Sequence, residues 1–253
     1  MPEPSSPPPS RPDTEASAPD LPDGVVVVDK PAGLSSMNAV SAVRRRAGRK
    51  AGHAGTLDPL ATGVLVIGIG RATKSLDRFM KTRKGYRTEI DFSGFTATDD
   101  REGDLQPVEV EVPPTAEAIS SMLDTRFTGE FMQVPPDFSA KKVDGRRAYA
   151  TARRGESPKL DPRPVRVHRA LLEHFQWPIA TVHIECEKGF YVRSLARDLG
   201  RQLGVGGHCA SIRRTAVGPF KLEHATALDD LPEPLTGNHV IPLTEALGML
   251  TSD

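Results

Sequence analysis

The chain is predicted to adopt an α+β fold. Two segments with the apolar–polar alternation of strands, 165–173 and 181–187, follow one another without a helix between them. Helical patterns occur elsewhere in the chain, and no internal repeat is present. Consecutive strands without helical crossovers favour an α+β fold over a parallel α/β fold, in which a helix separates the strands.

The folded part is predicted to begin with a buried strand over 24–30. Residues 1–23 before it are rich in proline, serine and acidic residues. They hold too little apolar surface to offset the entropy cost of ordering, so we expect a disordered tail. After the strand, a helix is expected to start at Ser35 or Ser36 and to end near Arg46.

The rest of the chain is expected to alternate between strands and helices. Thr115 is a suitable N-cap for one helix, and Gly204 is a suitable end for another. The expected elements are a strand over 64–69, a helix over 73–81, a strand over 86–92, a polar loop over 94–103, a helix over 115–123, an extended segment over 141–154 that turns at Asp144–Gly145 into a helix containing Tyr149, the strands at 165–173 and 181–187, a helix over 193–203 and a helix over 243–250.

The composition indicates a soluble globular protein, with 253 residues, 38% apolar and 26% charged. The longest apolar runs, 25–28 and 64–69, are too short to span a bilayer, and the N-terminus lacks the features of a secretory signal. We therefore expect a cytoplasmic location and no membrane association. Cys186 and Cys209 have no cysteine partner at zinc spacing, so we expect reduced, structural thiols and no metal site.

The net charge is zero, but the charges are distributed unevenly. Between 44 and 87 only Asp58 and Asp77 oppose a long series of basic residues. A second basic stretch covers 141–154, and the compensating acids lie in the tail and over 89–130. A basic patch of this kind favours binding to a polyanion such as RNA, although ordinary solvated faces would give the same pattern.

The most informative segment is the glycine-bracketed loop GHAGTLDPLATGVL, residues 52–65. It presents one carboxylate, Asp58, with His53 five residues before it and no second acid beside it. The proline that follows disfavours helical dihedrals at Asp58, so the carboxylate lies on an extended or turning backbone. Residue types alone leave two interpretations open, because Asp–Pro pairs also form simple turns.

This loop resembles the signature loop of the TruB family of tRNA pseudouridine synthases. Four further blocks extend the resemblance over about 24–220. They are DKPAGLSS at 29–36, KGYR at 84–87, QVPPDFSAKKVDGRRAY at 133–149 and KGFYVRSL at 188–195, and ASIRRT at 210–215 is similar to the closing motif of the family. Three positions depart from the usual residues: Asn38 stands in place of an acid, Phe138 in place of tyrosine and Ile212 in place of leucine.

The resemblance implies a catalytic domain over 24–220, with a mixed, mostly antiparallel central sheet flanked by helices. It leaves 221–253 as a short extension, and we expect no full C-terminal RNA-binding domain there. The family isomerises uridine to pseudouridine without a cofactor, and its bacterial members act on the T-loop uridine of tRNA, position 55. We therefore expect a monomer that binds the T arm of tRNA and needs no small-molecule cofactor.

Roles for individual residues also follow from the resemblance. Asp58 is implied to be the catalytic nucleophile, acting by covalent attack or, in an alternative scheme, by abstracting a proton. An arginine can hold a carboxylate through paired hydrogen bonds, so Arg193 is expected to bind Asp58. The other implied contacts to the substrate are His53 in the space left by the flipped base, and Tyr86, Tyr191 and Ile212 around the uracil.

Two further residues each have two open roles. Lys30, at a strand end beside a glycine turn, could meet a phosphate or brace the catalytic loop, and a solvated strand end is the simpler alternative. Asp100 could contact the RNA or order its own loop. The base that removes the C5 proton is also open between Tyr86 and a water molecule.

Three alternative functions remain at this stage. The first is a non-catalytic protein that binds or folds tRNA through the same basic surface. The second is a related synthase acting on another RNA. The third is a hydrolase with an aspartate nucleophile, which is disfavoured because that class needs a second acid or a metal-bound water.

Overall fold

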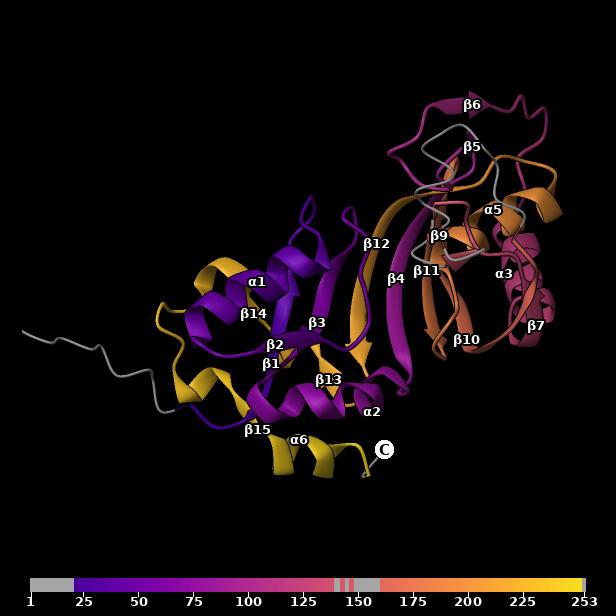
Figure 1. The fold of residues 1–253 in the computed structure, drawn as a ribbon. Helices are drawn as coiled ribbons and strands as arrows, with labels where there is room; N and C mark the ends of the chain where they lie inside the picture. The colour runs from indigo at the N-terminus through magenta and orange to yellow at the C-terminus, as the bar shows by residue number, and fades with distance from the viewer. Residues whose placement is uncertain (1–20, 139–141, 144–145, 148–159, 252–253) are drawn as a thin grey trace, which may run out of the picture.

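The computed structural model describes residues 21–138, 142–143, 146–147 and 160–251. Its main feature is an eleven-stranded sheet that runs across the molecule (Figure 1). The strands of the main path are, in spatial order, β14 (Thr226–Ala227), β1 (Gly24–Lys30), β3 (Thr62–Ile69), β12 (His208–Val217), β4 (Lys84–Asp91), β11 (Ile179–Cys186), β10 (Arg163–Gln176) and β7 (Gly129–Gln133). Three short strands pair off this path: β2 (Ala51–His53) with β3, β13 (Phe220–Lys221) with β12, and β15 (Ile241–Pro242) with β1.

The sheet is mixed and mostly antiparallel, as the sequence predicts. Only the pairs β1–β14 and β3–β12 are parallel. The contact between β3 and β12 is short, with the register Arg213 to Thr62 and Arg214 to Gly63. It joins a half of the sheet built around β1 and β3 to a half built around β4, β11 and β10. The junction between the two halves is the place where Asp58 and Arg193 meet.

The five α-helices that the structure describes are α1 (Ser36–Ala47), α2 (Leu76–Met80), α3 (Ala116–Arg126), α5 (Val192–Leu203) and α6 (Leu243–Met249). The expected caps are confirmed. Ser35 caps α1, Thr115 caps α3, and α5 ends at Gly204 in the left-handed conformation.

Alternate side chains of β1 point to opposite faces of the sheet, as strand geometry requires. Val26 and Val28 belong to the large apolar cluster that includes α1. Val25 and Val27 belong to a second cluster with Phe79 of α2 and side chains of α6. Figure 1 accordingly shows α1 on one side of β1 and β3, with α2 and α6 on the other. A strand buried on both faces explains the uninterrupted run of valines at 25–28.

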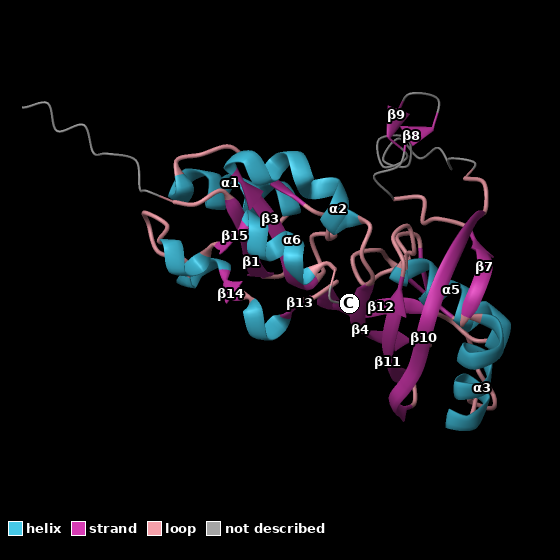
Figure 2. Cartoon of the chain, turned by 90° about the horizontal axis from the view of Figure 1, so that it is seen from below, coloured by secondary structure: helices cyan, strands magenta, loops and turns pink. Residues whose placement is uncertain are grey.

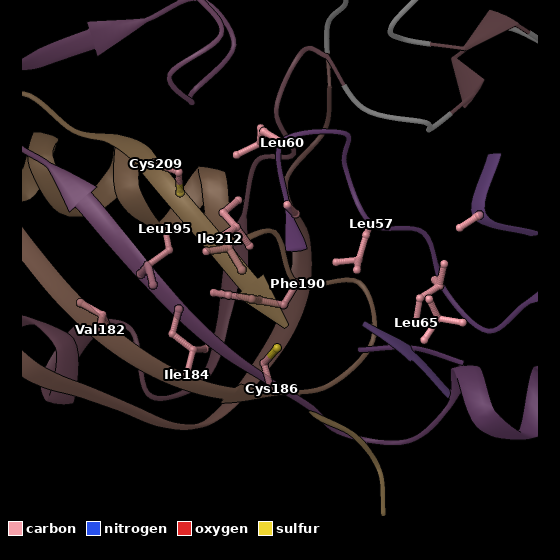
Figure 3. Close-up of a cluster of buried hydrophobic side chains, with 14 of the residues drawn as sticks. Leu57, Leu60, Leu65, Val182, Ile184, Cys186, Phe190, Leu195, Cys209 and Ile212 are labelled. Atoms are coloured by element: carbon pink, nitrogen blue, oxygen red, sulfur yellow. The ribbon is translucent and has the colours of Figure 1, made fainter. Parts of the chain in front are cut away.

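The second half of the sheet is covered by α3 and α5, which contribute Ile119, Leu123, Leu195 and Leu199 to the large cluster. Figure 2 shows α3 beside β10 and β7 at the end of the molecule away from α1. Leu57 and Leu60 of the Asp58 loop belong to the same cluster as Phe190 and Ile212 of the second half (Figure 3). The loop is thus packed into the core at its leucines.

Several predicted elements differ from the observed ones. The helix expected over 73–81 begins as a 3-10 helix over Gly70–Ser75 and becomes α-helical only over Leu76–Met80. The polar loop over 94–103 contains β5 (Gly94–Thr96), which pairs with β6 (Leu105–Pro107). Within the segment 141–154, β8 (Lys142–Val143) pairs with β9 (Arg146–Arg147), and the helix expected around Tyr149 lies outside the described residues.

Residues 21–23 of the predicted tail pack on the folded part. Leu21 is buried, and Asp23 forms ion pairs with Arg49 and Arg71. The expectation of disorder was wrong for residues 21–23, because these side chains find partners on the folded part. The rest of the predicted tail lies outside the described residues.

At the other end, β14 and β15 add to the edge of β1, so part of the segment after 220 joins the main sheet. The division of the chain at residue 220 stays a prediction. In the described part of the chain, no helix has both the length and the apolar character needed to cross a membrane.

Candidate active site

Asp58 lies in the loop between β2 and β3, and its backbone neighbours are fixed from the strand β1 and the helix α1. Ser36 Oγ accepts a hydrogen bond from Leu57 N (2.8 Å) and donates one to Leu57 O (2.9 Å). Gly33 N donates to Pro59 O at 2.8 Å. The residues on both sides of Asp58 are thus anchored, whereas 39% of the Asp58 side chain is exposed. This arrangement presents a carboxylate from a rigid support.

Arg193, the second residue of α5, holds the Asp58 carboxylate. Its Nε lies 2.9 Å from Asp58 Oδ2, and its Nη1 lies 3.3 Å from Asp100 Oδ2. The guanidinium also donates to the carbonyl oxygens of Thr98 and Phe138, both at 3.0 Å. The expected pairing of Arg193 with Asp58 is therefore present. Because four partners surround a buried guanidinium, its orientation is fixed and it can orient Asp58 in turn.

Asp100 is a second acid at the site, across Arg193 from Asp58. Its side chain is only 2% exposed and accepts hydrogen bonds from Thr98 Oγ1 (2.6 Å) and Glu102 N (3.0 Å). The carboxylate is enclosed by its own loop and by Arg193, which favours the alternative in which Asp100 orders its loop. The isolation of Asp58 from other acids in the sequence is thus not an isolation in space.

A pocket of about 320 Å³ opens beside Asp58. Its volume is in the range of small-ligand sites. It is lined by five of the eight residues predicted for the site, namely Asp58, Tyr86, Tyr191, Arg193 and Ile212. Other lining residues include Leu57, Met80, Lys84, Phe190 and Arg214. Two acidic residues, Asp58 and Glu187, line the pocket together with basic, aromatic and aliphatic side chains. The aromatic and aliphatic walls beside Asp58 suit a flat ring.

The two tyrosines of the pocket are held differently. The backbone of Tyr191 is fixed by Gln133, whose side chain accepts from Tyr191 N (2.9 Å) and donates to Tyr191 O (3.1 Å). The Tyr86 side chain lies near enough to the Arg214 guanidinium to feel its positive charge. Burial raises the pKa of Tyr86, and the charge of Arg214 acts in the opposite direction.

The other three predicted residues do not line this pocket. Lys30 is fully buried, and its Nζ donates to the carbonyl oxygens of Pro31 (2.7 Å), Leu34 (2.7 Å) and Pro59 (3.3 Å). The pKa of Lys30 is lowered to about 8, mainly by burial and also by the charge of Arg214, against the opposing effect of Asp58. A solvated strand end was wrong for Lys30, because no part of it reaches solvent. Its hydrogen bond to Pro59 O favours a brace for the Asp58 loop over a phosphate contact.

His53 is half-buried on β2 and, like Lys30 and Asp100, does not line the pocket. Burial lowers the pKa of the imidazole, and the positive charge of Arg214 lowers it further. Its Nδ1 is buried without a hydrogen-bond partner among the described residues. At neutral pH the ring is therefore uncharged, and nothing in the described structure fixes it by a polar contact at Nδ1.

Arg214 is a site residue to which the sequence analysis gave no role. It is 1% exposed, and its guanidinium donates to the carbonyl oxygens of Val64 (2.7 Å), Thr56 (3.3 Å) and Gly55 (3.2 Å). The close approach of the strands is possible because Gly63 has φ +102°, and a Cβ there would lie 2.2 Å from Arg214 O. The available signal was its place in the closing motif at 210–215.

Lys84 was also missed, although it stands in the motif that contains Tyr86. It is 6% exposed, lines the pocket and donates to the carbonyl oxygens of Met80 and Thr82. The pKa of Lys84 is lowered to about 8, mainly by burial and also by the charge of Arg214. No group of three or more His, Cys, Asp or Glu side chains is placed to hold a metal ion in the described part of the chain.

Two family models match the chain. The model described as TruB family pseudouridylate synthase (N terminal domain) covers residues 44–192. The model described as tRNA pseudouridylate synthase B C-terminal domain covers residues 193–243. Asp58 falls in the first match and Arg193 is the first residue of the second, so the ion pair at the site draws on both. The boundary between the matches lies at the start of α5, inside the continuous fold.

Similar proteins carry the same family name. The chain is 46% identical over 235 residues to tRNA pseudouridine synthase B of Thermobifida fusca (strain YX), which covers 89% of this chain and 78% of that protein. It is 49% identical over 215 residues to tRNA pseudouridine synthase B of Mycobacterium tuberculosis (strain ATCC 25618 / H37Rv), covering 83% of this chain and 72% of that protein.

Solved structures agree with the fold. A Cbf5-Nop10-Gar1 complex matches with a TM-score of 0.69 and 25% identity over 95% of this chain and 68% of that one. The archaeal box H/ACA sRNP Nop10-Cbf5 complex matches with a TM-score of 0.60 and 28% identity over 83% of this chain. This chain spans about half, 53%, of the length of that last protein. Together with the two family models and the relatives, these matches place the chain in the TruB family of tRNA pseudouridine synthases, which are isomerases.

Proposed function

We propose that this protein converts the T-loop uridine of tRNA, position 55, to pseudouridine, and that Asp58 is its catalytic carboxylate. The observation that carries the proposal is the ion pair of 2.9 Å between Asp58 and Arg193 at the wall of a pocket lined by Tyr86, Tyr191 and Ile212. The names of the relatives from Thermobifida fusca and Mycobacterium tuberculosis support tRNA as the substrate.

The reaction breaks the bond between N1 of the base and C1′ of the ribose and then joins C5 of the same ring to C1′. A proton leaves C5 and one is added at N1, so no redox partner is required. A stacked base is out of reach of the pocket, so the uridine must be extruded into it. Tyr86, Tyr191 and Ile212 would then enclose the ring, and Asp58 would face the sugar.

Asp58 reacts in this proposal while Arg193 keeps its carboxylate oriented. Both schemes for the first step, covalent attack and proton abstraction, begin at this carboxylate. For the later step we assign the transfer of the C5 proton to the Tyr86 hydroxyl. The nearby charge of Arg214 supports this role, because a guanidinium stabilises the phenolate, which is the form of Tyr86 that can accept the C5 proton and become a neutral phenol.

Two finer points belong to the same proposal. Exposed basic side chains on α1, just before β2 and after β3 would contact the phosphates of the T arm; they include Arg44, Lys50, Lys74 and Arg78. The proposal also includes a monomer that acts on tRNA in the cytoplasm. Light scattering of the purified protein alone and with tRNA tests the monomer.

The test is to incubate the purified protein with an unmodified tRNA transcript and to map pseudouridine chemically. We expect product at position 55, and none in a transcript that carries cytidine there. The Asp58→Asn variant should bind the transcript as the wild type does and form no product. Product at other positions only would replace the T-loop assignment by another RNA target, and full activity of Asp58→Asn would overturn the role of Asp58.

A further inference from the structure

Beyond the ion pair already described, α5 carries a second buried arginine. Arg197 follows Arg193 by one helical turn, so the two side chains lie on the same face of the helix. Arg197 is 8% exposed, and its Nη1 lies 2.7 Å from Asp99 Oδ2. Arg193 meets the next acid in the loop, Asp100. Two consecutive acids are thus bound by two arginines one turn apart.

The backbone at Asp99 adopts the left-handed conformation. Asp99 has φ 58°, and no other non-glycine residue in the described part of the chain has a positive φ. A side chain with a Cβ is disfavoured in the left-handed region, and such a conformation persists only where its surroundings impose it. It turns the chain between Asp99 and Asp100 so that both carboxylates reach α5.

Contacts to Asp99 and Arg197 come from several elements. Cys209 N of β12 donates to Asp99 O at 3.0 Å. Arg197 donates to Val134 O (2.9 Å) and to the carboxylate of Asp198 (2.9 Å from its Nε). The pair therefore ties the Asp99 loop to α5 and to the chain that leaves β7. Thr98 O, one residue before Asp99, is itself bound by Arg193.

We propose that the Arg197–Asp99 ion pair is a positioning device for the reaction, which holds the left-handed turn at Asp99 and thereby keeps Asp100 on Arg193 and Arg193 on Asp58. Neither residue lines the pocket, so both act through others. The inference rests on the proposed function only for its kinetic consequence. The structural link from Arg197 to Asp58 can be tested without substrate.

The charges around Asp99 give the pair a pH dependence. Burial raises the pKa of Asp99 to about 6, against the lowering effects of Arg197 and Arg193, and Asp198 raises it further. Asp100 is the adjacent acid, and Cys209 on β12 is uncharged because burial raises the pKa of its thiol to about 12. As the pH falls through about 6, Asp99 gains a proton and its ion pair with Arg197 is lost.

The experiment measures kcat, KM and their pH dependence on tRNA for Arg197→Met, Asp99→Asn and the double variant. We expect each single change to lower kcat about tenfold with KM for tRNA within about twofold, since a small misplacement of reacting groups lowers turnover more than binding. The double variant should be no worse than Arg197→Met, because removing both partners leaves no unpaired buried charge. The fall of kcat below about pH 6 in the wild type should be absent in Asp99→Asn.

Arg201→Met is the matched control. Arg201 lies one more turn along α5, is 63% exposed and is 3.9 Å from Asp198, so its loss should leave kcat unchanged. A role in folding alone predicts lower thermal stability in Arg197→Met with wild-type kcat and an unaltered pH profile. That result, or single effects that multiply in the double variant, would overturn the proposal.

A crystal structure of Arg197→Met gives an answer that is independent of the substrate. We expect the Asp100 carboxylate to leave Arg193, and its retention at the wild-type distance of 3.3 Å would overturn the proposal. If the wild type forms no pseudouridine at position 55, the proposed function fails, while this structure still decides whether the pair positions Asp100.

Discussion

Two buried arginines flank the reactive side chains, and their partners differ in charge. Arg193 contacts two carboxylates, Asp58 and Asp100. Arg214 donates to three backbone carbonyl oxygens and acts on Tyr86 through its charge, and no carboxylate of the described residues lies within ion-pair distance of it. The charge of Arg193 is therefore neutralised by neighbouring carboxylates, and the charge of Arg214 is not.

The difference assigns distinct tasks to the two sides of the pocket. The neutralised Arg193 acts through geometry, because its fork fixes the direction of Asp58. The positive charge of Arg214 acts at a distance: after burial, it is a cause of the lowered pKa values of Lys30, His53 and Lys84. The same charge opposes the effect of burial on Tyr86. Four changes test this division.

The largest effect is expected from Tyr86→Phe, which removes the hydroxyl on which the charge of Arg214 acts and keeps the ring. We expect kcat to fall about 10³-fold with little change in KM, within the range for the loss of a positioned acid or base. Tyr191→Phe is the matched control, because the described contacts of Tyr191 run through its backbone and its hydroxyl has no assigned task. Similar losses of kcat in Tyr86→Phe and Tyr191→Phe would show that the two hydroxyls do not differ in function.

Arg193→Lys tests the geometric task. Lysine keeps the charge but cannot reproduce the planar fork that joins Asp58 and Asp100. We expect kcat on tRNA to fall about 10²-fold, because the carboxylate is no longer held in one direction. Wild-type turnover in this variant would show that charge alone suffices at this position, and that the two sides of the pocket do not differ in the way described.

Much of the structure was predictable from local signals. Ser35, Thr115 and Gly204 mark helix ends by the hydrogen bonds and dihedrals that their side chains permit. The strand β12 was not predicted, although it forms the junction with β3. Its register shifts between Cys209 and Ser211 and between Arg214 and Ala216, and each shift breaks the alternation that identifies a strand.

The sequence pointed to most of the residues of the site, but it did not show how deeply they are buried or which groups surround them. The resemblance pointed to Arg193 as the partner of Asp58 across 135 positions, a separation that no periodicity reports. Burial decided the roles of Lys30 and Asp100, and burial depends on which carbonyl and guanidinium groups converge on them in three dimensions. A charged residue at a strand end is ordinarily solvated, so its sequence position gave no sign of a buried lysine.

Arg214→Lys, unlike the two previous variants, is tested by its effect on stability. An ammonium group cannot reach the carbonyl oxygens of Val64, Thr56 and Gly55 together, so buried acceptors are left without a donor. We expect the free energy of unfolding to fall by about 2 kcal/mol, measured by chemical denaturation. Arg213→Lys is the control, because Arg213 is 41% exposed and pairs with Asp29, so its replacement should cost less than about 1 kcal/mol.

The smallest effect concerns His53, whose pKa lies below its ordinary value of 6.5 because of burial and then of Arg214. The unfolded chain binds a proton at this imidazole more readily than the folded chain does. The free energy of unfolding should therefore fall as the pH drops below about 6.5, and this part of the loss should be absent in His53→Asn. NMR titration of the ring in the wild type measures the pKa directly. A value at or above 6.5 would show that the charge of Arg214 does not reach β2, and the contrast between the two arginines would then be confined to the pocket itself.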